Sequence, residues 1–327
     1  MKYKIAIVTP EVKNDYLTDT LIDGLVSLKN ELDLEFYAPE GYPCRISDFN
    51  SFLPTIPFFD FTERADLILF CWGKGNTNYE LINRINRFNQ TVFIDGSEVG
   101  GNRRFDSDIQ KQLLERTYDG NGKVDKVMLK KCALYFKREK PYMDGIIPFP
   151  FGIERRYRRH YSEEVKKDTD FFCVFGQDEY PVLRREVRVA LEEFCKKNNF
   201  SFFTEKTDQE NFYKVLAKSK VGISVGGGGY DTARFWEILG NNCLLLTEKI
   251  DIYEEGSDRL KFRRMWQFKD LMEFKSELEK VANFLKTEYK KEDLRDEYET
   301  ILSNHSSKAR VLEILEKARE KGIIGKS

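Results

Sequence analysis

Residues 221–240 read Val221-Gly-Ile-Ser-Val-Gly-Gly-Gly-Gly-Tyr-Asp-Thr-Ala-Arg-Phe-Trp-Glu-Ile-Leu-Gly240. A β-rich run over 221–225 ends in four glycines, and a helical run starts near Thr232. Glycines let the backbone approach a ligand closely and adopt positive φ. The first turn of a helix offers unpaired N–H groups and a partial positive charge, which favour a phosphate. The segment therefore predicts an anion-binding turn between a strand and a helix.

Four polar residues of this segment have candidate roles. Asp231 or Thr232 is expected to cap the helix. Arg234 would meet phosphates, and Glu237 could accept hydrogen bonds from sugar hydroxyls. The segment has neither the Gly-Lys-Ser/Thr of a Walker loop nor a Gly-x-Gly-x-x-Gly followed by a distant acidic residue. The alternative interpretation is an ordinary glycine turn before a capped helix, with Arg234 and Glu237 as an i,i+3 ion pair.

Strand and helix patterns alternate along the rest of the chain. Strands are expected at 4–9, 34–37, 66–72, 91–94, 134–136, 171–175, 200–204 and 243–247. Helices are expected at 17–32, 79–88, 126–132, 183–198, 209–218 and from 271 onward. This alternation is typical of parallel sheets with helical crossovers, and it restarts after Pro150. We expect an α/β fold with two Rossmann-like, doubly wound domains that face a cleft.

The expected domain boundaries follow from that restart. Residues 1–150 form the first Rossmann-like domain, and residues 151–285 form the second. Residues 286–327 are charged helices that are expected to pack back across the domains.

Composition narrows the function classes. Among 327 residues, 54 basic and 55 acidic side chains give a net charge of −1, which disfavours a nucleic-acid binder. No apolar run reaches the roughly 18 residues of a membrane span, and the N-terminal segment lacks a secretory pattern. Six scattered cysteines form no Cys-x-x-Cys pair. These features indicate a cytoplasmic protein.

Residues 230–247 resemble the donor segment of GT-B glycosyltransferases, most closely the CgeB-like (spore-maturation protein) family. That family has a glycine-rich turn, a helix with Arg-x-x-Glu, a small-residue turn and an apolar strand. Residues 171–176 with the arginine pair at 184–185 resemble the first strand of its donor domain. Residues 135–138 and 147–152 resemble the segment that closes the first domain. The similarity covers about 130–247.

The resemblance implies a nucleoside diphosphate sugar as donor and GT-B architecture, with the first domain on the acceptor side and the second on the donor side. Glu237 would hold the ribose, and Arg184, Arg185 and Arg234 would meet the diphosphate, with Arg234 also stabilising the departing charge. The donor-binding candidates are Gly176, Arg184, Arg185, Gly226, Gly227, Gly228, Gly229, Tyr230, Asp231, Thr232, Arg234 and Glu237. Paired-glutamate GT-B enzymes carry another glutamate eight residues before the second one, but this chain has Gly229 there. Retention or inversion therefore stays open.

An inverting transferase needs a base near the acceptor hydroxyl. Asp95 and Glu98, after the strand at 91–94, are the first candidates in the first domain. Glu11 and Asp15, after the first strand, come next. The alternative interpretation of Asp95-Gly96 is a turn.

No cofactor and no metal site are expected, because the chain has only two histidines, His160 and His305, and GT-B enzymes commonly need no metal. Asp106-Ser-Asp108 matches the Asp-x-Asp of metal-dependent GT-A transferases. It does not follow an apolar strand, so we interpret it as a helix cap in a loop.

The partners expected are a nucleoside diphosphate sugar and an unidentified acceptor, which is a glycan, a lipid-linked molecule or a protein. A dense cationic patch is formed by Arg155, Arg156, Arg158 and Arg159. It is either a solvated hinge or a contact for an anionic acceptor or a membrane surface.

The sequence favours a metal-independent glycosyltransferase. A sugar-nucleotide epimerase or hydrolase of the same fold is the first alternative, although the few histidines offer little acid–base chemistry. A non-catalytic nucleotide- or carbohydrate-binding protein is the second, because of Gly229. A nucleic-acid glucosyltransferase would need a basic groove, and neither half of the chain has a basic surplus beyond one charge.

Overall fold

The computed structural model describes residues 3–9, 15–39, 42–43, 45, 58–72, 78–98, 124–139, 144–177, 182–227, 229–250, 252–253 and 257–325. The chain divides into two compact units. The first contains residues 1–152, 252–254 and 305–327, and the second contains 153–251 and 255–304. The boundary between them falls at Gly152. The charged tail is shared, since its last helix belongs to the first unit.

The first unit is built on a six-stranded sheet in the order β2-β1-β3-β4-β5-β6, in which every neighbouring pair is parallel. The strands are β1 (Tyr3–Val8), β2 (Leu34–Tyr37), β3 (Leu67–Trp72), β4 (Thr91–Asp95), β5 (Leu134–Lys137) and β6 (Ile146–Pro148). The central strand β4 is buried along its whole length, as is typical of a strand covered on both faces.

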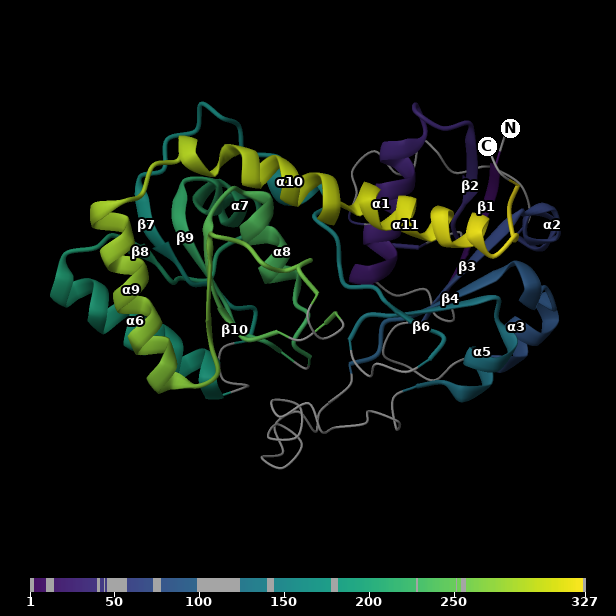
Figure 1. Cartoon of the computed structure of the whole chain (residues 1–327), viewed down its shortest axis with the longest axis horizontal. Coiled ribbons are helices and arrows are strands. Elements are labelled where there is room, and N and C mark those ends of the chain that lie inside the picture. The colour runs from purple at the N-terminus through teal and green to yellow at the C-terminus, as the bar shows by residue number, and fades with distance from the viewer. Residues whose placement is uncertain are drawn as a thin grey trace. The chain divides into compact units, whose positions relative to one another are not determined.

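Helices cover both faces of this sheet (Figure 1). They are α1 (Tyr16–Leu28), α2 (Phe58–Arg64), α3 (Tyr79–Ile85), α5 (Lys126–Lys131) and α11 (Ser307–Glu320). Phe61, Ile82 and Met128, from α2, α3 and α5, join one core with strand residues such as Phe70 and Phe93. The helices α1 and α11 lie side by side away from that core.

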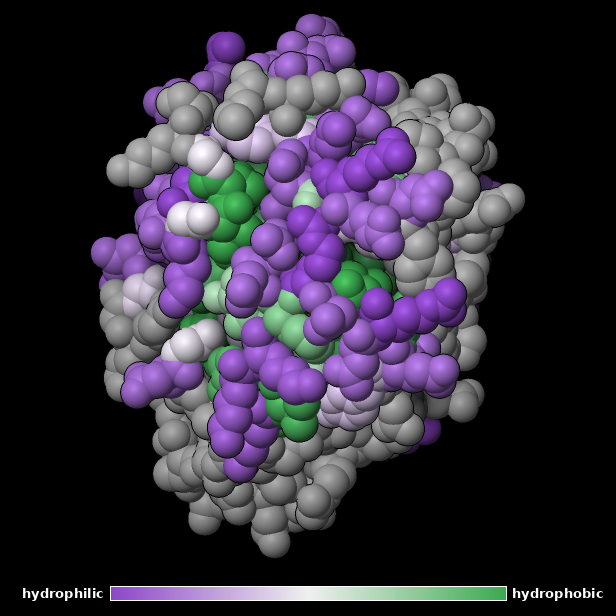
Figure 2. Space-filling model, turned by 90° about the vertical axis from the view of Figure 1, so that its right-hand side faces the viewer, coloured by the Kyte–Doolittle hydropathy of each residue, from purple (hydrophilic) through white to green (hydrophobic). Residues whose placement is uncertain are grey.

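The contact between α1 and α11 depends on one glycine. A Cβ built on Gly24 would lie 2.3 Å from the Ser307 backbone oxygen, so the close approach needs a residue without a side chain. The Ser307 hydroxyl donates to the buried Asp23 carboxylate. The buried Arg310 donates through Nε to the backbone oxygen of Pro150 at 3.1 Å. Figure 2 shows one face of this unit, on which hydrophilic side chains surround small hydrophobic patches.

The second unit has a five-stranded parallel sheet in the order β11-β10-β9-β7-β8. Its strands are β7 (Thr169–Phe172), β8 (Phe202–Phe203), β9 (Ser219–Ser224), β10 (Leu244–Glu248) and β11 (Met265–Phe268). Its helices are α6 (Val182–Asn198), α7 (Gln209–Ala217), α8 (Ala233–Gly240), α9 (Leu271–Thr287) and α10 (Arg295–His305), with a 3-10 turn η5 (Arg155–Arg158).

In this unit α6 and α9 pack on one face of the sheet, and α7 and α8 lie on the other (Figure 1). The core beneath α6 and α9 contains Val187, Leu191 and Phe274 against the strand residues Phe171 and Val221. Gly222 allows α8 to sit close to the sheet, because a Cβ there would lie 2.5 Å from Ile238 Cγ1.

When strands are numbered within each unit, the second sheet has the order 2-1-3-4-5 of the flavodoxin-like variant of doubly wound folds, and the first sheet has the same order with a sixth strand added. The two-domain α/β expectation is therefore confirmed, and the structure adds the strand order. In such sheets ligands bind beyond the carboxyl ends of the strands where the order reverses. That point lies between β1 and β3 in the first unit and between β7 and β9 in the second. No helix in the described part of the chain combines the length and apolarity needed to cross a bilayer.

Candidate functional site

The residues that follow β7 and β9 meet at the switch point of the second unit. Val174 to Gln177 follow β7, and Val225 to Thr232 follow β9. This is the segment that the sequence predicts to bind an anion. Gly228 lies outside the described residues, and Gly176 is exposed, with no atom within 4 Å of a Cβ built on it.

The first glycines after β9 use their N–H groups within the protein. Gly226 donates to Glu248 Oε2 at 2.8 Å, and Gly227 donates to the Gly229 oxygen at 2.9 Å. The Glu248 side chain is buried at the end of β10. These two N–H groups are therefore engaged already, and an anion would have to meet the start of α8 instead.

Thr232 is the residue that caps α8. Its hydroxyl accepts from the Phe235 N–H, and its backbone has the extended conformation of a cap. Asp231, the other candidate, accepts from Trp236 Nε1 at 2.7 Å and is buried. The N–H groups of Ala233 and Arg234 precede the first intrahelical bond, and no hydrogen bond to them is present among the described residues. They are the donors that a phosphate would find here.

Arg184, on α6, joins the two loops of the switch point. Its Nη1 donates to the Gln177 oxygen at 2.9 Å, and its Nη2 donates to the Val225 oxygen at 3.1 Å. A Cβ on Gly227 would lie 2.9 Å from Nη2, so the glycine leaves room for the guanidinium. Arg185, the next residue, is exposed. The structure thus places Arg184 beside the glycine turn.

Arg234 and Glu237 form the i,i+3 ion pair, through Arg234 Nη1 and Glu237 Oε2. Arg234 Nε also donates to the Val174 oxygen at 2.9 Å, and its guanidinium lies 4.1 Å from the centre of the Phe212 ring. Nη2 makes no hydrogen bond within the described chain. The ion pair does not exclude a role of Arg234 and Glu237 in ligand binding, because both side chains also lie at the switch point.

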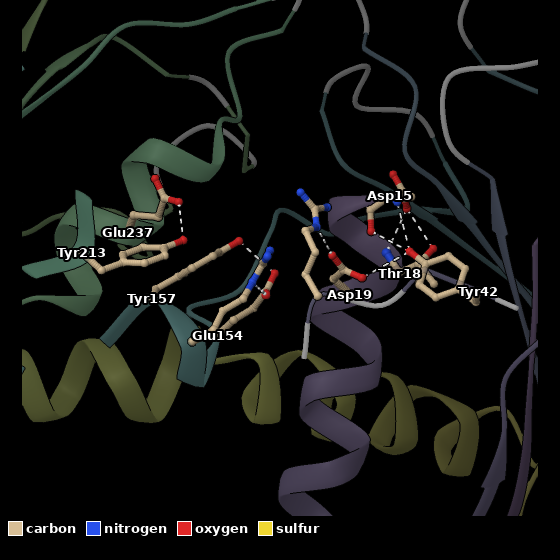
Figure 3. Close-up of polar contacts among 10 residues, drawn as sticks. Asp15, Thr18, Asp19, Tyr42, Glu154, Tyr157, Tyr213 and Glu237 are labelled. Atoms are coloured by element: carbon tan, nitrogen blue, oxygen red, sulfur yellow. Dashed lines mark hydrogen bonds and ion pairs between the residues drawn. The ribbon is translucent and has the colours of Figure 1, made fainter. Parts of the chain in front are cut away.

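Tyr213, on α7, is a site residue that the sequence analysis missed. Its hydroxyl donates to Glu237 Oε1 at 2.8 Å (Figure 3). Arg234 holds the other carboxylate oxygen, Oε2. Glu237 keeps 10 % of its side chain exposed. The sequence alone gives no signal for Tyr213, because there it is one of several residues on the apolar face of an amphipathic helix. Its place in the site depends on where the fold positions α7. Tyr230, predicted from the glycine segment, is half-buried after Gly229.

Asp95 occupies a closed network in the first unit. Its Oδ2 accepts from the Tyr135 hydroxyl at 2.6 Å, its Oδ1 accepts from the Ser97 N–H at 2.8 Å, and Lys137 Nζ lies 3.4 Å away. Burial lowers the pKa of Lys137, although Asp95 opposes that shift. Asp95 is fully buried, so this geometry favours the turn interpretation and gives no support to a role as base.

Glu98 keeps 10 % of its side chain exposed and pairs with Arg138 Nη2 at 3.2 Å. Arg138 Nη2 also meets Glu139 Oε1 at 3.2 Å. Of the two first candidates for a base, only Glu98 retains access to solvent. Its role stays a prediction.

Asp15 caps α1, at the switch point of the first unit. Its Oδ2 accepts from the N–H and the hydroxyl of Thr18, both at 2.9 Å (Figure 3). One turn further on, the buried Asp19 accepts from Arg45 Nε at 2.7 Å and from the Tyr42 hydroxyl at 3.3 Å. Asp19 is a second residue that the sequence analysis missed. Glu11 lies outside the described residues.

Two of the four arginines in the predicted cationic patch form ion pairs within the second unit. Arg156 donates to Glu154, and Arg159 pairs with Glu210 at 2.7 Å. Arg155, Arg158 and Arg159 are exposed. The patch is therefore partly neutralised by its own neighbours.

The expectation that Asp106 and Asp108 do not form a metal site is not tested by the structure, because both residues lie outside the described ranges. Within the described ranges, no group of three histidine, cysteine or acidic side chains is arranged to hold a metal ion. His160 Nε2 lies 3.0 Å from Glu210 Oε1, and the buried His305 Nδ1 lies 3.0 Å from Arg310 Nη2.

Comparison with known proteins identifies the fold. No family model matches the chain, and no curated protein matches it. A glycosyltransferase from Rickettsia africae ESF-5 is similar in structure, with a TM-score of 0.57 and 11 % identity over 98 % of each chain. Anabaena Alr3699/HepE, solved in complex with UDP, gives a TM-score of 0.51 and 10 % identity over 97 % of this chain and 100 % of that one.

The UDP-GlcNAc 2-epimerase from Methanocaldococcus jannaschii has a TM-score of 0.49 and 10 % identity over 97 % of this chain and 99 % of that one. At these identities the first two structures show the fold alone. The chain has the GT-B fold of two parallel-sheet α/β units. The finer resemblance to the CgeB-like family stays a prediction.

Proposed function

We propose that this chain is a glycosyltransferase whose second unit binds a nucleoside diphosphate sugar at the carboxyl ends of β7 and β9. The observation that carries the proposal is the grouping of Arg184, the start of α8 and the Arg234–Glu237 pair at one switch point. Cations and unpaired N–H groups suit a diphosphate, and a partly exposed carboxylate suits the hydroxyls of a ribose.

In this proposal, cationic and N–H groups bind the diphosphate, and a carboxylate binds the ribose. The N–H groups of Ala233 and Arg234, with the guanidiniums of Arg184 and Arg234, hold the diphosphate. As the acceptor hydroxyl attacks the anomeric carbon, its proton passes to a base, for which Glu98 is the candidate. The bond to the diphosphate breaks, and negative charge grows on the leaving group. Fixed donors stabilise that charge more strongly in the transition state than in the bound donor. Glu237 holds the ribose, and the first unit supplies the acceptor side.

UDP is the first nucleotide to test, because the Anabaena protein was solved with UDP. We also propose that transfer needs no metal, since cationic side chains already gather where a metal would neutralise the diphosphate. Turnover should survive EDTA. Loss of turnover in EDTA with recovery in Mn²⁺ would instead favour Asp106 and Asp108 as ligands.

The acceptor is an unidentified glycan, lipid-linked molecule or protein. The exposed Arg155, Arg158 and Arg159 would suit an anionic acceptor or a membrane surface. We further propose a relationship to the CgeB-like family, supported by residues 130–247. Two other activities fit the same fold: a sugar-nucleotide epimerase or hydrolase, and a nucleotide- or carbohydrate-binding protein without catalysis.

A two-stage experiment separates these functions. A thermal-shift screen with UDP, GDP, ADP and dTDP comes first, since a ligand at 100 times its dissociation constant stabilises by about 2.7 kcal/mol. The sugar derivative of the best nucleotide is then incubated with and without candidate acceptors. Acceptor-dependent release of the nucleoside diphosphate is expected. Conversion of the sugar nucleotide without an acceptor would indicate an epimerase or hydrolase. Nucleotide binding without turnover would indicate a binding protein. No thermal stabilisation by any nucleotide would contradict the proposal.

A further inference from the structure

Two tyrosines in the second unit each hold one carboxylate. Tyr213 donates to Glu237 Oε1 at 2.8 Å, and Tyr157 donates to Glu154 Oε1 at 2.8 Å. In each case an arginine holds the other carboxylate oxygen, Arg234 for Glu237 and Arg156 for Glu154. The two tyrosine rings stack with their centres 6.2 Å apart and an interplanar angle of 28° (Figure 3).

The Tyr213 hydroxyl can act only as a donor toward Glu237 near neutral pH. Burial, and next the Glu237 carboxylate, raise the pKa of Tyr213 far above its ordinary value. The phenol therefore stays protonated. A protonated phenol facing a carboxylate directs its single proton at the carboxylate oxygen. Glu237 is thus fixed at Oε1 by Tyr213 and at Oε2 by Arg234.

The ring of Tyr213 is held by its neighbours. Tyr157, which is fully buried, stacks on one side, and Phe212 contacts it edge-on with ring centres 5.1 Å apart. The backbone oxygen of Tyr157 accepts from Asn241 Nδ2 at 2.7 Å, and the same nitrogen donates to the Glu237 backbone oxygen at 2.8 Å. The turn η5 and α8 are therefore tied together at the residue whose carboxylate Tyr213 fixes.

We propose that Tyr213 is a positioning residue, which orients the Glu237 carboxylate toward the ribose hydroxyls of a bound nucleoside diphosphate. This inference rests on the proposed function. Each carboxylate oxygen has two lone pairs, so one hydrogen bond from the protein leaves capacity for a hydroxyl of the ligand. A carboxylate that is already oriented loses less side-chain freedom when the ligand binds. Tyr213 acts through Glu237 and does not touch the ligand.

The experiment compares two probes, UDP and 2′,3′-dideoxy-UDP, which lacks both ribose hydroxyls. Calorimetry measures the Kd of each probe for the parent chain and for Tyr213→Phe. We expect Tyr213→Phe to raise the Kd for UDP roughly three- to tenfold, because one hydrogen bond to a charged group is lost. The same variant should bind the dideoxy probe as the parent does, since that probe has no hydroxyl for Glu237 to hold.

Tyr289→Phe is the matched control. Tyr289 lies on the second unit, and nothing in the described chain hydrogen-bonds its largely buried hydroxyl. It should bind both probes as the parent does. Urea unfolding checks that each variant is folded, and Tyr213→Met, which also lacks the hydroxyl, is the second variant if Tyr213→Phe does not fold.

Each result decides a separate question. If Tyr213→Phe weakens the binding of both probes equally, Tyr213 only supports the fold. If UDP binding is unchanged, Tyr213 does not position Glu237. Either outcome overturns the inference and leaves the proposed function standing. A parent chain that does not bind UDP would overturn both.

Discussion

The carboxylate of Glu248 accepts a hydrogen bond from the backbone N–H of Gly226 at 2.8 Å. This contact joins the end of β10 to the first glycine after β9, two neighbouring strands of one parallel sheet. On the other side of the turn, Arg184 donates to the Val225 oxygen. The glycine turn is therefore anchored at its start from two directions, although its own sequence would allow many conformations.

Removing the Glu248 anchor should destabilise the chain. Glu248→Ala leaves the buried Gly226 N–H without its acceptor, which costs about 1–3 kcal/mol. We expect the urea midpoint to fall accordingly and UDP affinity to fall with it. Glu248→Gln retains an acceptor oxygen and should recover most of the stability. Equal stability of Glu248→Ala and the parent would show that the contact does not anchor the turn.

Arg234 is expected to matter more for turnover than for binding. Arg234→Ala releases Glu237 and removes a cation from the start of α8, so the Kd for UDP should rise roughly three- to tenfold. The rate constant should fall further, by about a hundredfold or more, because one fixed donor to a developing charge is lost. Calorimetry and initial rates with the active donor measure the two effects.

Arg295→Ala provides the control for that experiment, since Arg295 is an exposed residue that pairs with Glu299 on α10. It should change neither Kd nor rate. A drop in affinity for Arg234→Ala with no further loss of rate would contradict a role in stabilising the leaving group.

Asp170 should make the stability of the chain depend on pH. It lies on β7 and accepts from Lys220 Nζ at 2.6 Å and from the Ser201 N–H at 2.9 Å. Burial alone would raise its pKa, but these hydrogen bonds outweigh burial and lower the pKa of Asp170 below its usual value. The stabilisation is therefore complete above the unfolded pKa of about 3.9 and is lost as the pH falls through the lower, folded value.

Asp170→Asn tests this dependence. The free energy of unfolding of the parent should exceed that of the variant by about 1–2 kcal/mol near neutral pH. This difference should shrink as the pH falls below about 4. Urea unfolding at several pH values measures it. A difference that stays constant down to the acid limit of folding would mean that the charge of Asp170 is not responsible.

Periodicity predicted much of the fold because long elements repeat their pattern. The helix expected at 183–198 is α6 (Val182–Asn198), and the apolar run at 243–247 is β10 (Leu244–Glu248). Short elements were missed. The edge strand β11 (Met265–Phe268) is mostly half-exposed and has little alternation, and α2 (Phe58–Arg64) spans only two turns. Patterns of that length do not distinguish a strand or a helix from a loop.

The candidate site was predicted only where its residues are neighbours in sequence. The glycines, Thr232, Arg234 and Glu237 occur in one segment, so local spacing indicated their grouping. Tyr213 and Glu248 reach the same place from other elements, and only the parallel strand order brings them there. The surroundings of Asp95 could not be predicted for the same reason, since its burial depends on Tyr135 and Lys137 from the next strand.

Calorimetry of UDP binding to the parent chain and to Glu237→Gln tests the central claim most directly. The substitution keeps the shape of the side chain and removes the charge that would hold two ribose hydroxyls. We predict that the parent binds UDP and that Glu237→Gln binds it about tenfold more weakly or worse, which corresponds to about 1.4 kcal/mol. Equal affinity, with only a loss of thermal stability, would show that Glu237 is a packing partner of Tyr213 and Arg234 and would contradict the donor site.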